Sequence, residues 1–157
     1  MARRAPSRAA ARSPEASYLE RAIDRYAPDV AGTARAALRK LRTRFPGARW
    51  LVYERRQSLP IGLAPAEGGS AVFSVVLSQR WVRFFLLEGA LLDDPDSRLE
   101  GSGSQVRSIR LDATADVLDD PGIHALMTAA LRAAGTNLRT GTGSVVIKSK
   151  IQSRAPR

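Results

Sequence analysis

Four consecutive apolar runs in the middle of the chain are separated by joints too short to hold a helix. The runs are ARWLVYERR, SLPIGLAPA, AVFSVVLSQ and WVRFFLLEG, and from Arg49 onward their side chains follow a period of two. Parallel neighbours need a crossover of a dozen or more residues, whereas antiparallel neighbours need only a turn. Gly68-Gly69 and Ser78-Gln79-Arg80 therefore predict an antiparallel meander. GSQVRSIRL adds a weaker fifth strand that ends at Leu111.

Helical periodicity flanks this meander on both sides. Residues 14–26 and 29–45 carry apolar side chains at helical spacing, and Pro46-Gly47 ends the second stretch. A third helix begins at Pro121 and ends before Gly135. The order of two helices, a meander of about five strands and a C-terminal helix predicts an α+β fold, with helices packed on one face of the sheet.

Positive charge is concentrated at the two ends of the chain. A chain of 157 residues predicts one domain, and its net charge is +10. Acidic residues are absent from residues 1–13, which hold four arginines, and from residues 136–157, which hold five basic residues. We therefore expect a disordered basic head at 1–13, a single domain at 14–135 and a basic tail at 136–157. Within the tail, an apolar run could add a short edge strand at 144–149.

Several classes of protein are disfavoured by what the sequence lacks. It contains no cysteine and a single histidine, His124, so disulfides, thiol nucleophiles and multi-histidine metal sites are excluded. No G-x-S-x-G motif accompanies its serines. No apolar stretch has the length of a secretory signal or a membrane span. The sequence predicts a cytoplasmic, non-enzymatic protein that uses no cofactor and no membrane.

The fourth run, WVRFFLLEG, has apolar side chains on both of its faces. A strand of this kind is covered on both sides, or its second face meets a partner. Our leading hypothesis is a binding or scaffold domain whose sheet face contacts a small ligand or another copy of the chain in a homodimer. The aromatic residues expected on that face are Trp50, Tyr53, Trp81 and Phe85.

An arginine stripe on the second helix supports an alternative function, nucleic-acid binding. Arg35, Arg39 and Arg42 share one side of that helix, opposite its apolar stripe. Together with the two basic tails they could neutralise phosphates, with affinity that falls steeply with salt. A solvated helix face is the structural alternative for the same residues.

The loop GALLDDPDSRLEGSGSQVRSIRL offers an anion-binding hypothesis. Backbone N–H groups around two loop glycines could form an anion nest, assisted by two following arginines. A simple glycine turn that leads into a strand explains the same pattern. The residues concerned are Gly101, Gly103, Arg107 and Arg110.

The segments LVYE, SLPIGLAP, VFSVVL, GALLDDPDSRLEGSGSQVRSIRL and VVIKSKIQSRAPR resemble the bacterial YdhG-like family, a domain of unknown function numbered 1801. The likeness runs from Tyr18 to the C-terminus and is most specific over Gly89–Arg107. It implies a small α+β domain, sometimes labelled a frataxin-like iron chaperone, and brings no catalytic residues.

Iron binding is accordingly a third possible function. The first two helices are rich in arginine, so a cation would be repelled from their faces. The better positions for a hard cation are the acidic residues of the loop, Asp93, Asp94, Asp96 and Glu100.

Overall fold

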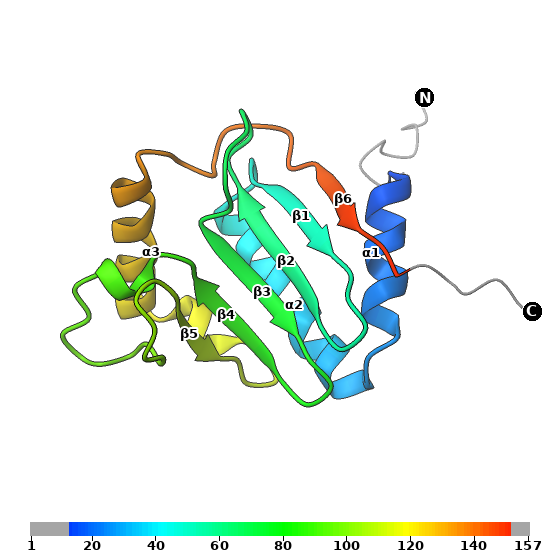
Figure 1. Cartoon of the computed structure of the whole chain (residues 1–157), viewed down its shortest axis with the longest axis horizontal. Coiled ribbons are helices and arrows are strands. Elements are labelled where there is room, and N and C mark those ends of the chain that lie inside the picture. Colours follow the sequence, from blue (N-terminus) through cyan, green and yellow to red (C-terminus); the bar gives the residue numbers. More distant parts are fainter. Residues whose placement is uncertain (1–12, 152–157) are drawn as a thin grey trace, which may run out of the picture.

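The computed structural model describes residues 13–151. Three helices and six strands follow one another in the order expected from the sequence, with two short 3-10 helices between them (Figure 1). The helices are α1 (Pro14–Asp24), α2 (Pro28–Arg44) and α3 (Pro121–Ala134), and the 3-10 turns are η2 (Gly89–Leu91) and η3 (Asp116–Asp119). The strands are β1 (Arg49–Tyr53), β2 (Leu59–Ala64), β3 (Phe73–Leu77), β4 (Val82–Leu86), β5 (Arg107–Arg110) and β6 (Val145–Ser149).

The six strands form a single mixed sheet with the order β5-β4-β3-β2-β1-β6. Strands β1 to β5 pair antiparallel with their neighbours in sequence, which confirms the α+β class and the predicted meander. The edge strand β6 lies beside β1 and runs parallel to it. This parallel pair was not predicted, and it is possible because α3 and the loop after it carry the chain back across the molecule.

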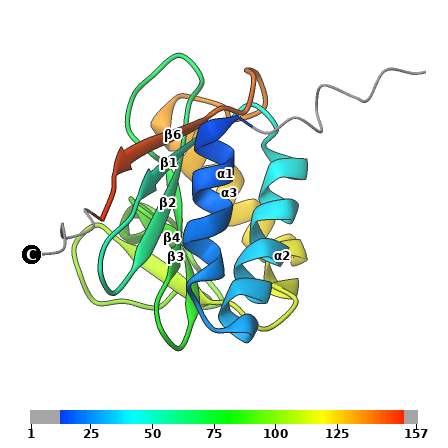
Figure 2. The same cartoon turned by 90° about the vertical axis from the view of Figure 1, so that its right-hand side faces the viewer.

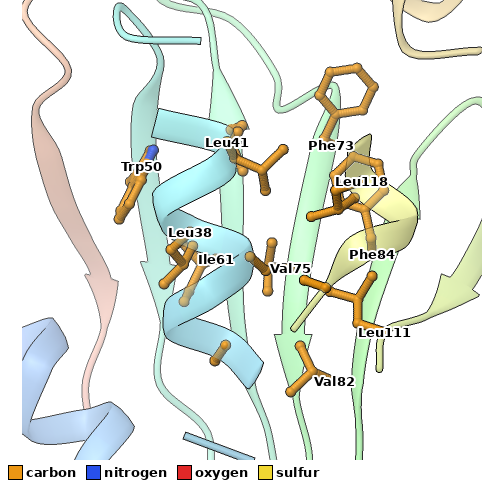
Figure 3. Packing of buried hydrophobic residues seen from close by; sticks show 14 of the residues in the cluster. Leu38, Leu41, Trp50, Ile61, Phe73, Val75, Val82, Phe84, Leu111 and Leu118 are labelled. Atoms are coloured by element: carbon orange, nitrogen blue, oxygen red, sulfur yellow. The ribbon is translucent and has the colours of Figure 1, made fainter. Parts of the chain in front are cut away.

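All three helices lie on one side of the sheet (Figure 2). Ser13 caps α1, and Asp120 caps α3 by accepting from Gly122 N at 2.8 Å. From α2, Leu38 and Leu41 point toward the sheet residues Ile61 and Val75 (Figure 3). These apolar faces meet in one core that spans the sheet.

The core is centred on three aromatic rings that connect α2 to the middle of the sheet. The Phe45 and Phe73 ring centroids lie 5.6 Å apart, and the Phe73 and Phe84 centroids lie 5.3 Å apart. Phe73 and Phe84 are completely buried. Aromatic pairs at these separations attract one another beyond the effect of area burial alone.

The packed domain extends beyond the predicted boundary at residue 135. Leu138 is fully buried, and β6 occupies the position expected for the edge strand. The backbone after α3 also approaches α2 closely: a Cβ at Gly47 would lie 2.1 Å from the Thr140 carbonyl oxygen. Residues 136–151 are therefore part of the fold rather than a loose tail. The predicted head at 1–13 lies outside the described residues except for Ser13.

A buried carboxylate fastens the C-terminal segment to the rest of the sheet. Glu54 follows β1 and is only 6% exposed, yet both of its oxygens are bonded. Oε1 accepts from the Tyr18 hydroxyl and, at 3.0 Å, from Ile151 N, while Oε2 accepts from Arg25. Burial and the bond to Glu54 raise the pKa of the Tyr18 hydroxyl. One side chain thus joins α1, β1 and the segment after β6.

Replacing this carboxylate is expected to destabilise the fold. Glu54→Ala leaves the part-buried Tyr18 hydroxyl and the Ile151 N–H without their acceptor and removes the ion pair with Arg25, which lowers the free energy of unfolding by about 1–2 kcal/mol. Urea unfolding of the full chain measures this loss. Glu67→Ala, at an exposed glutamate, is the matched control and should change stability by less than about 0.5 kcal/mol. Equal stability of the two variants would contradict the proposed role of Glu54.

Candidate functional site

Within residues 13–151, no helix covers the face of the sheet opposite α1, α2 and α3, and we call it the open face (Figures 1 and 2). One row of paired residues crosses this open face from β6 to β5. In register, the row consists of Val146, Leu51, Gly62, Ser74, Phe85 and Ser108. Its two central members, Gly62 and Ser74, are small, and the segment before β3 packs against Gly62.

A hollow of about 460 Å³ occupies the β1–β3 part of this open face. Tyr53, Leu51 and Leu87 supply apolar surface. The chain before β3 folds back over the face, and a Cβ at Gly62 would lie 3.0 Å from the Ala71 Cβ. Glycine at position 62 therefore permits this close approach. We call this cavity the sheet hollow. Its lining residues are Arg49, Leu51, Tyr53, Arg55, Pro60, Gly62, Gly69, Ser70, Ala71, Ser74, Leu87 and Lys148.

The charged groups of the sheet hollow are all positive. Arg49 donates from Nε to the Pro65 carbonyl at 3.0 Å, which holds its guanidinium at the rim. Arg55 and Lys148 are exposed and make no ion pair with any residue between 13 and 151. No carboxylate lines the cavity, so its electrostatic potential favours an anion.

Only part of the predicted aromatic surface lies on the open face. Tyr53 and Phe85 lie there, half-buried, and Trp81 lies in the β3–β4 turn beside the Arg83 guanidinium. The prediction for Trp50 was wrong, because Trp50 faces the helices and belongs to the core. Trp50 and Tyr53 are three positions apart in one strand, and a period of two places such residues on opposite faces.

The predicted arginine stripe does not form a common binding surface. Arg35 is paired with Glu20 and Asp24 of α1. The Arg42 guanidinium stacks 3.8 Å from the centre of the Trp50 ring, and burial lowers the pKa of Arg42. Arg39 is the member that remains exposed. The helical period places residues on one side of a helix but does not show which of them meet partners from other elements.

One arginine of the predicted anion nest is bonded within the loop before β5. Arg107 Nη1 donates to the Gly103 carbonyl at 2.6 Å and to the Val106 carbonyl at 2.9 Å. Carbonyl oxygens of the loop therefore bind the Arg107 guanidinium, a cation of the same chain. Gly101, at φ +132°, lies against Arg107, and Arg110 is an exposed residue of β5. This favours the glycine-turn interpretation.

The acidic residues of the same loop do not gather into a metal site. Asp94 accepts from the backbone of Arg98 at 2.9 Å and of Leu99 at 2.8 Å, so its oxygens shape the turn. Glu100 pairs with Arg83. Within residues 13–151, no group of three or more histidine, aspartate or glutamate side chains is arranged to hold an ion, which corrects the hypothesis for Asp93, Asp94, Asp96 and Glu100.

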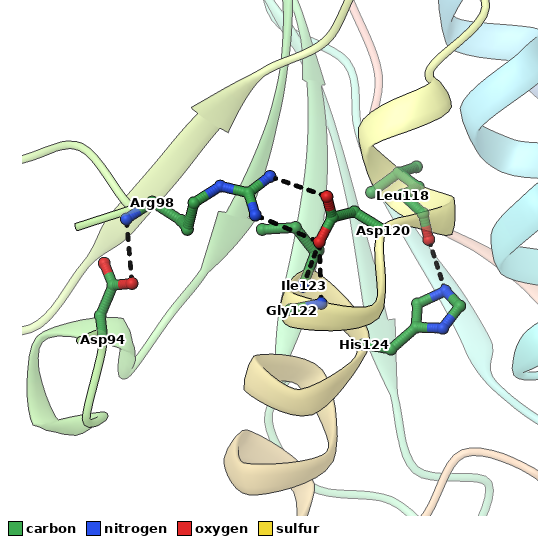
Figure 4. Close-up of polar contacts among 7 residues, drawn as sticks. All are labelled: Asp94, Arg98, Leu118, Asp120, Gly122, Ile123 and His124. Carbon is green, nitrogen blue, oxygen red and sulfur yellow. Dashed lines mark hydrogen bonds and ion pairs between the residues drawn. The ribbon is translucent and has the colours of Figure 1, made fainter. Parts of the chain in front are cut away.

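The loop is instead tied to the start of α3 by a double ion pair (Figure 4). Arg98 donates to the two carboxylate oxygens of Asp120 at 3.1 and 3.2 Å. The same carboxylate caps α3. The bond from Arg98, followed by the bond from the Gly122 backbone, lowers the pKa of Asp120. The acidic loop thus has a structural role that no spacing in the sequence indicated.

Comparisons with known proteins add no functional assignment to this geometry. Searches against protein-family models, curated proteins and solved structures each found no match. None of the helices in residues 13–151 has the length and apolar character needed to cross a bilayer. The class that the fold defines is a small α+β domain with helices on one face of a mixed sheet.

The Arg98–Asp120 pair predicts a specific acid sensitivity. Because the pKa of Asp120 is lowered in the folded state, its stabilising effect is complete above the ordinary aspartate pKa and is lost as the pH falls through the folded-state value. Asp120→Asn keeps a capping side chain but removes the charge. The unfolding temperature of this variant should lie below that of the wild type at pH 7, and the gap should begin to narrow at about pH 4 and close only below the folded-state pKa of Asp120.

Asp93→Asn provides the control for that experiment, since Asp93 is exposed in the same loop. Its unfolding temperature should follow the wild type throughout the pH range. A gap between Asp120→Asn and the wild type that stays constant from pH 7 to pH 2 would show that the ion pair does not contribute as described.

Proposed function

We propose that this chain is a small non-enzymatic binding domain whose sheet hollow holds an anionic small molecule. The observation that carries the proposal is a cavity with an apolar wall and only positive charges on the open face of the sheet. Its volume of about 460 Å³ falls within the range of small-molecule sites, which is about 300–1,000 Å³. The side chains that would recognise the ligand come from β1, β6 and the turn after β1.

The chemistry of the lining defines the two parts of the expected ligand. Arg55 and Lys148 would bind a carboxylate or phosphate group, because each can donate charge-assisted hydrogen bonds. Tyr53 and Leu87, both half-buried, would contact the apolar body of the ligand. Within residues 13–151, no imidazole, thiol or carboxylate lines the hollow, so Tyr53 and Lys148 are its only side chains of the kinds used in acid–base catalysis. This supports binding rather than turnover.

Charge also favours a small ligand over a second copy of the chain. A two-fold symmetric dimer places the same patch of both subunits together. Such a dimer through the sheet hollow would bring two sets of Arg49, Arg55 and Lys148 against each other without any carboxylate in the lining to balance them. Like-charge repulsion would oppose that contact.

The proposal also includes the family and the cellular location of the protein. We place the chain with the bacterial YdhG-like family on the segments quoted above, and we expect a cytoplasmic location. The α+β architecture is compatible with that placement.

A thermal-shift screen of the full chain tests the proposed function. Anionic metabolites with a ring or apolar body should raise the unfolding temperature, whereas neutral analogues of the same size should not. Size-exclusion chromatography with light scattering should report a monomer. A stable dimer, or a monomer that responds to none of these compounds, would contradict the proposal.

Paired variants locate the site. Arg55→Gln should weaken binding of the best ligand by roughly fivefold to tenfold, as expected for one partly exposed charged contact. Arg56→Gln removes the same charge one residue further on, outside the hollow, and should leave the affinity unchanged. Equal losses in the two variants would show that net charge, rather than the hollow, governs binding.

A further inference from the structure

A second cavity lies on the helix side of the molecule, between α2 and α3. Its volume is about 600 Å³. None of its lining residues belongs to the sheet hollow, so the two cavities are separate sites. We call this second cavity the helix cleft. Its walls are Arg39, Lys40, Leu41, Thr43, Arg44, Leu118, Asp119, His124, Met127 and Arg139.

Positive charge in the helix cleft exceeds what its own residues neutralise. Asp119 is the only acid in the lining, and it is already paired with Lys40. Arg39, Arg44 and Arg139 form no ion pair with any residue in the described part of the chain. Three guanidinium groups, two from α2 and one from the loop after α3, therefore border one cavity, and none of them is paired with a carboxylate of the described residues.

Arg44 gives a second, independent indication that an acceptor is missing. Its Nε is buried and has no hydrogen-bond partner within the described residues. A buried N–H without an acceptor is unfavourable and uncommon in folded proteins. Arg98, by contrast, is bonded by both oxygens of Asp120. This Nε has almost no accessible surface, so an oxyanion in the cleft would have to bind the other nitrogens of the Arg44 guanidinium.

The rest of the cleft is rigid and partly apolar. His124 Nε2 donates to the Leu118 carbonyl at 2.7 Å, which fixes the imidazole at one wall (Figure 4). Leu41 and Met127 are almost completely buried at the base of the cavity. Charged groups therefore lie at the rim of the cleft, and the buried side chains of Leu41 and Met127 lie beneath them.

We propose that the helix cleft binds a phosphorylated small molecule, with the phosphate held by Arg39, Arg44 and Arg139. The planar guanidinium group matches the oxygens of a phosphate and can bind two of them at once. This site is independent of the function proposed for the sheet hollow.

The surroundings of the cleft favour a small molecule over a nucleic acid. A polymer backbone needs positive surface that continues beyond one cavity. The adjoining cavity toward the N-terminus of α2 shares Arg39 and Lys40 but is also lined by Asp29 and Asp116. These carboxylates interrupt the positive surface after one phosphate-sized site.

Calorimetric titration of the full chain with inorganic pyrophosphate and with adenosine diphosphate tests this site. Both probes should bind, and Arg39→Gln and Arg139→Gln should each weaken binding by about tenfold, the loss expected for a charged hydrogen bond. Both arginines are exposed, so neither change should disturb folding. Arg132→Gln removes the same charge from exposed α3 surface outside the cleft and should have no effect.

Two comparisons can overturn the proposal. Losses of equal size in Arg132→Gln and Arg139→Gln, or no binding of either probe by the wild type, would show that the cleft is not a phosphate site. A larger loss in Arg55→Gln than in Arg39→Gln would assign the anion to the sheet hollow instead. A third experiment titrates the full chain with a short single-stranded DNA at two salt concentrations. Binding of DNA without binding of either small probe would also contradict the proposal.

Discussion

The architecture depends on one constraint: the helices cover a single face of a six-stranded sheet. A strand directs alternate side chains to opposite faces, so Phe73, Val75 and Leu77 enter the core while Ser74 and Val76 face away from it. The helices pack on the core face through the aromatic chain from Phe45 to Phe84. No helix of the described residues covers the opposite face, and the sheet hollow lies there beside the segment before β3.

Polar contacts then connect the outlying segments to this core. The buried Glu54 joins α1 to the end of β6, and Asp120 joins the long loop to α3. Both are carboxylates whose bonding is satisfied, so they act as structural anchors. Basic side chains without an ion pair in the described part of the chain border both cavities: Arg55 and Lys148 border one, and Arg39 and Arg139 border the other. Carboxylates whose hydrogen bonds are made within the chain have structural roles. Basic side chains that border a cavity without an ion pair are the candidate binding groups.

Local patterns in the sequence were sufficient for the class and the meander. The period of two in β3 and β4 and the short joints between the strands required antiparallel neighbours. Contacts between distant residues were not readable in this way: the parallel pairing of β6 with β1, the burial of Leu138 and the bonds of Glu54 each join segments far apart in the chain. The site was predicted only in part. Tyr53 and Phe85 lie on the open face, whereas Trp50 faces the core because strand parity, rather than aromatic character, decides the side.

The central claim is that the uncovered face of the sheet is where a ligand binds. The most direct test is an NMR titration of the isotopically labelled full chain with a mixture of anionic metabolites, followed through its backbone amides. The account predicts that the amide signals of Leu51, Gly62 and Ser74 shift together as the mixture is added. Signals on this face that stay unchanged, with every shift confined to the helix side or absent altogether, would contradict it.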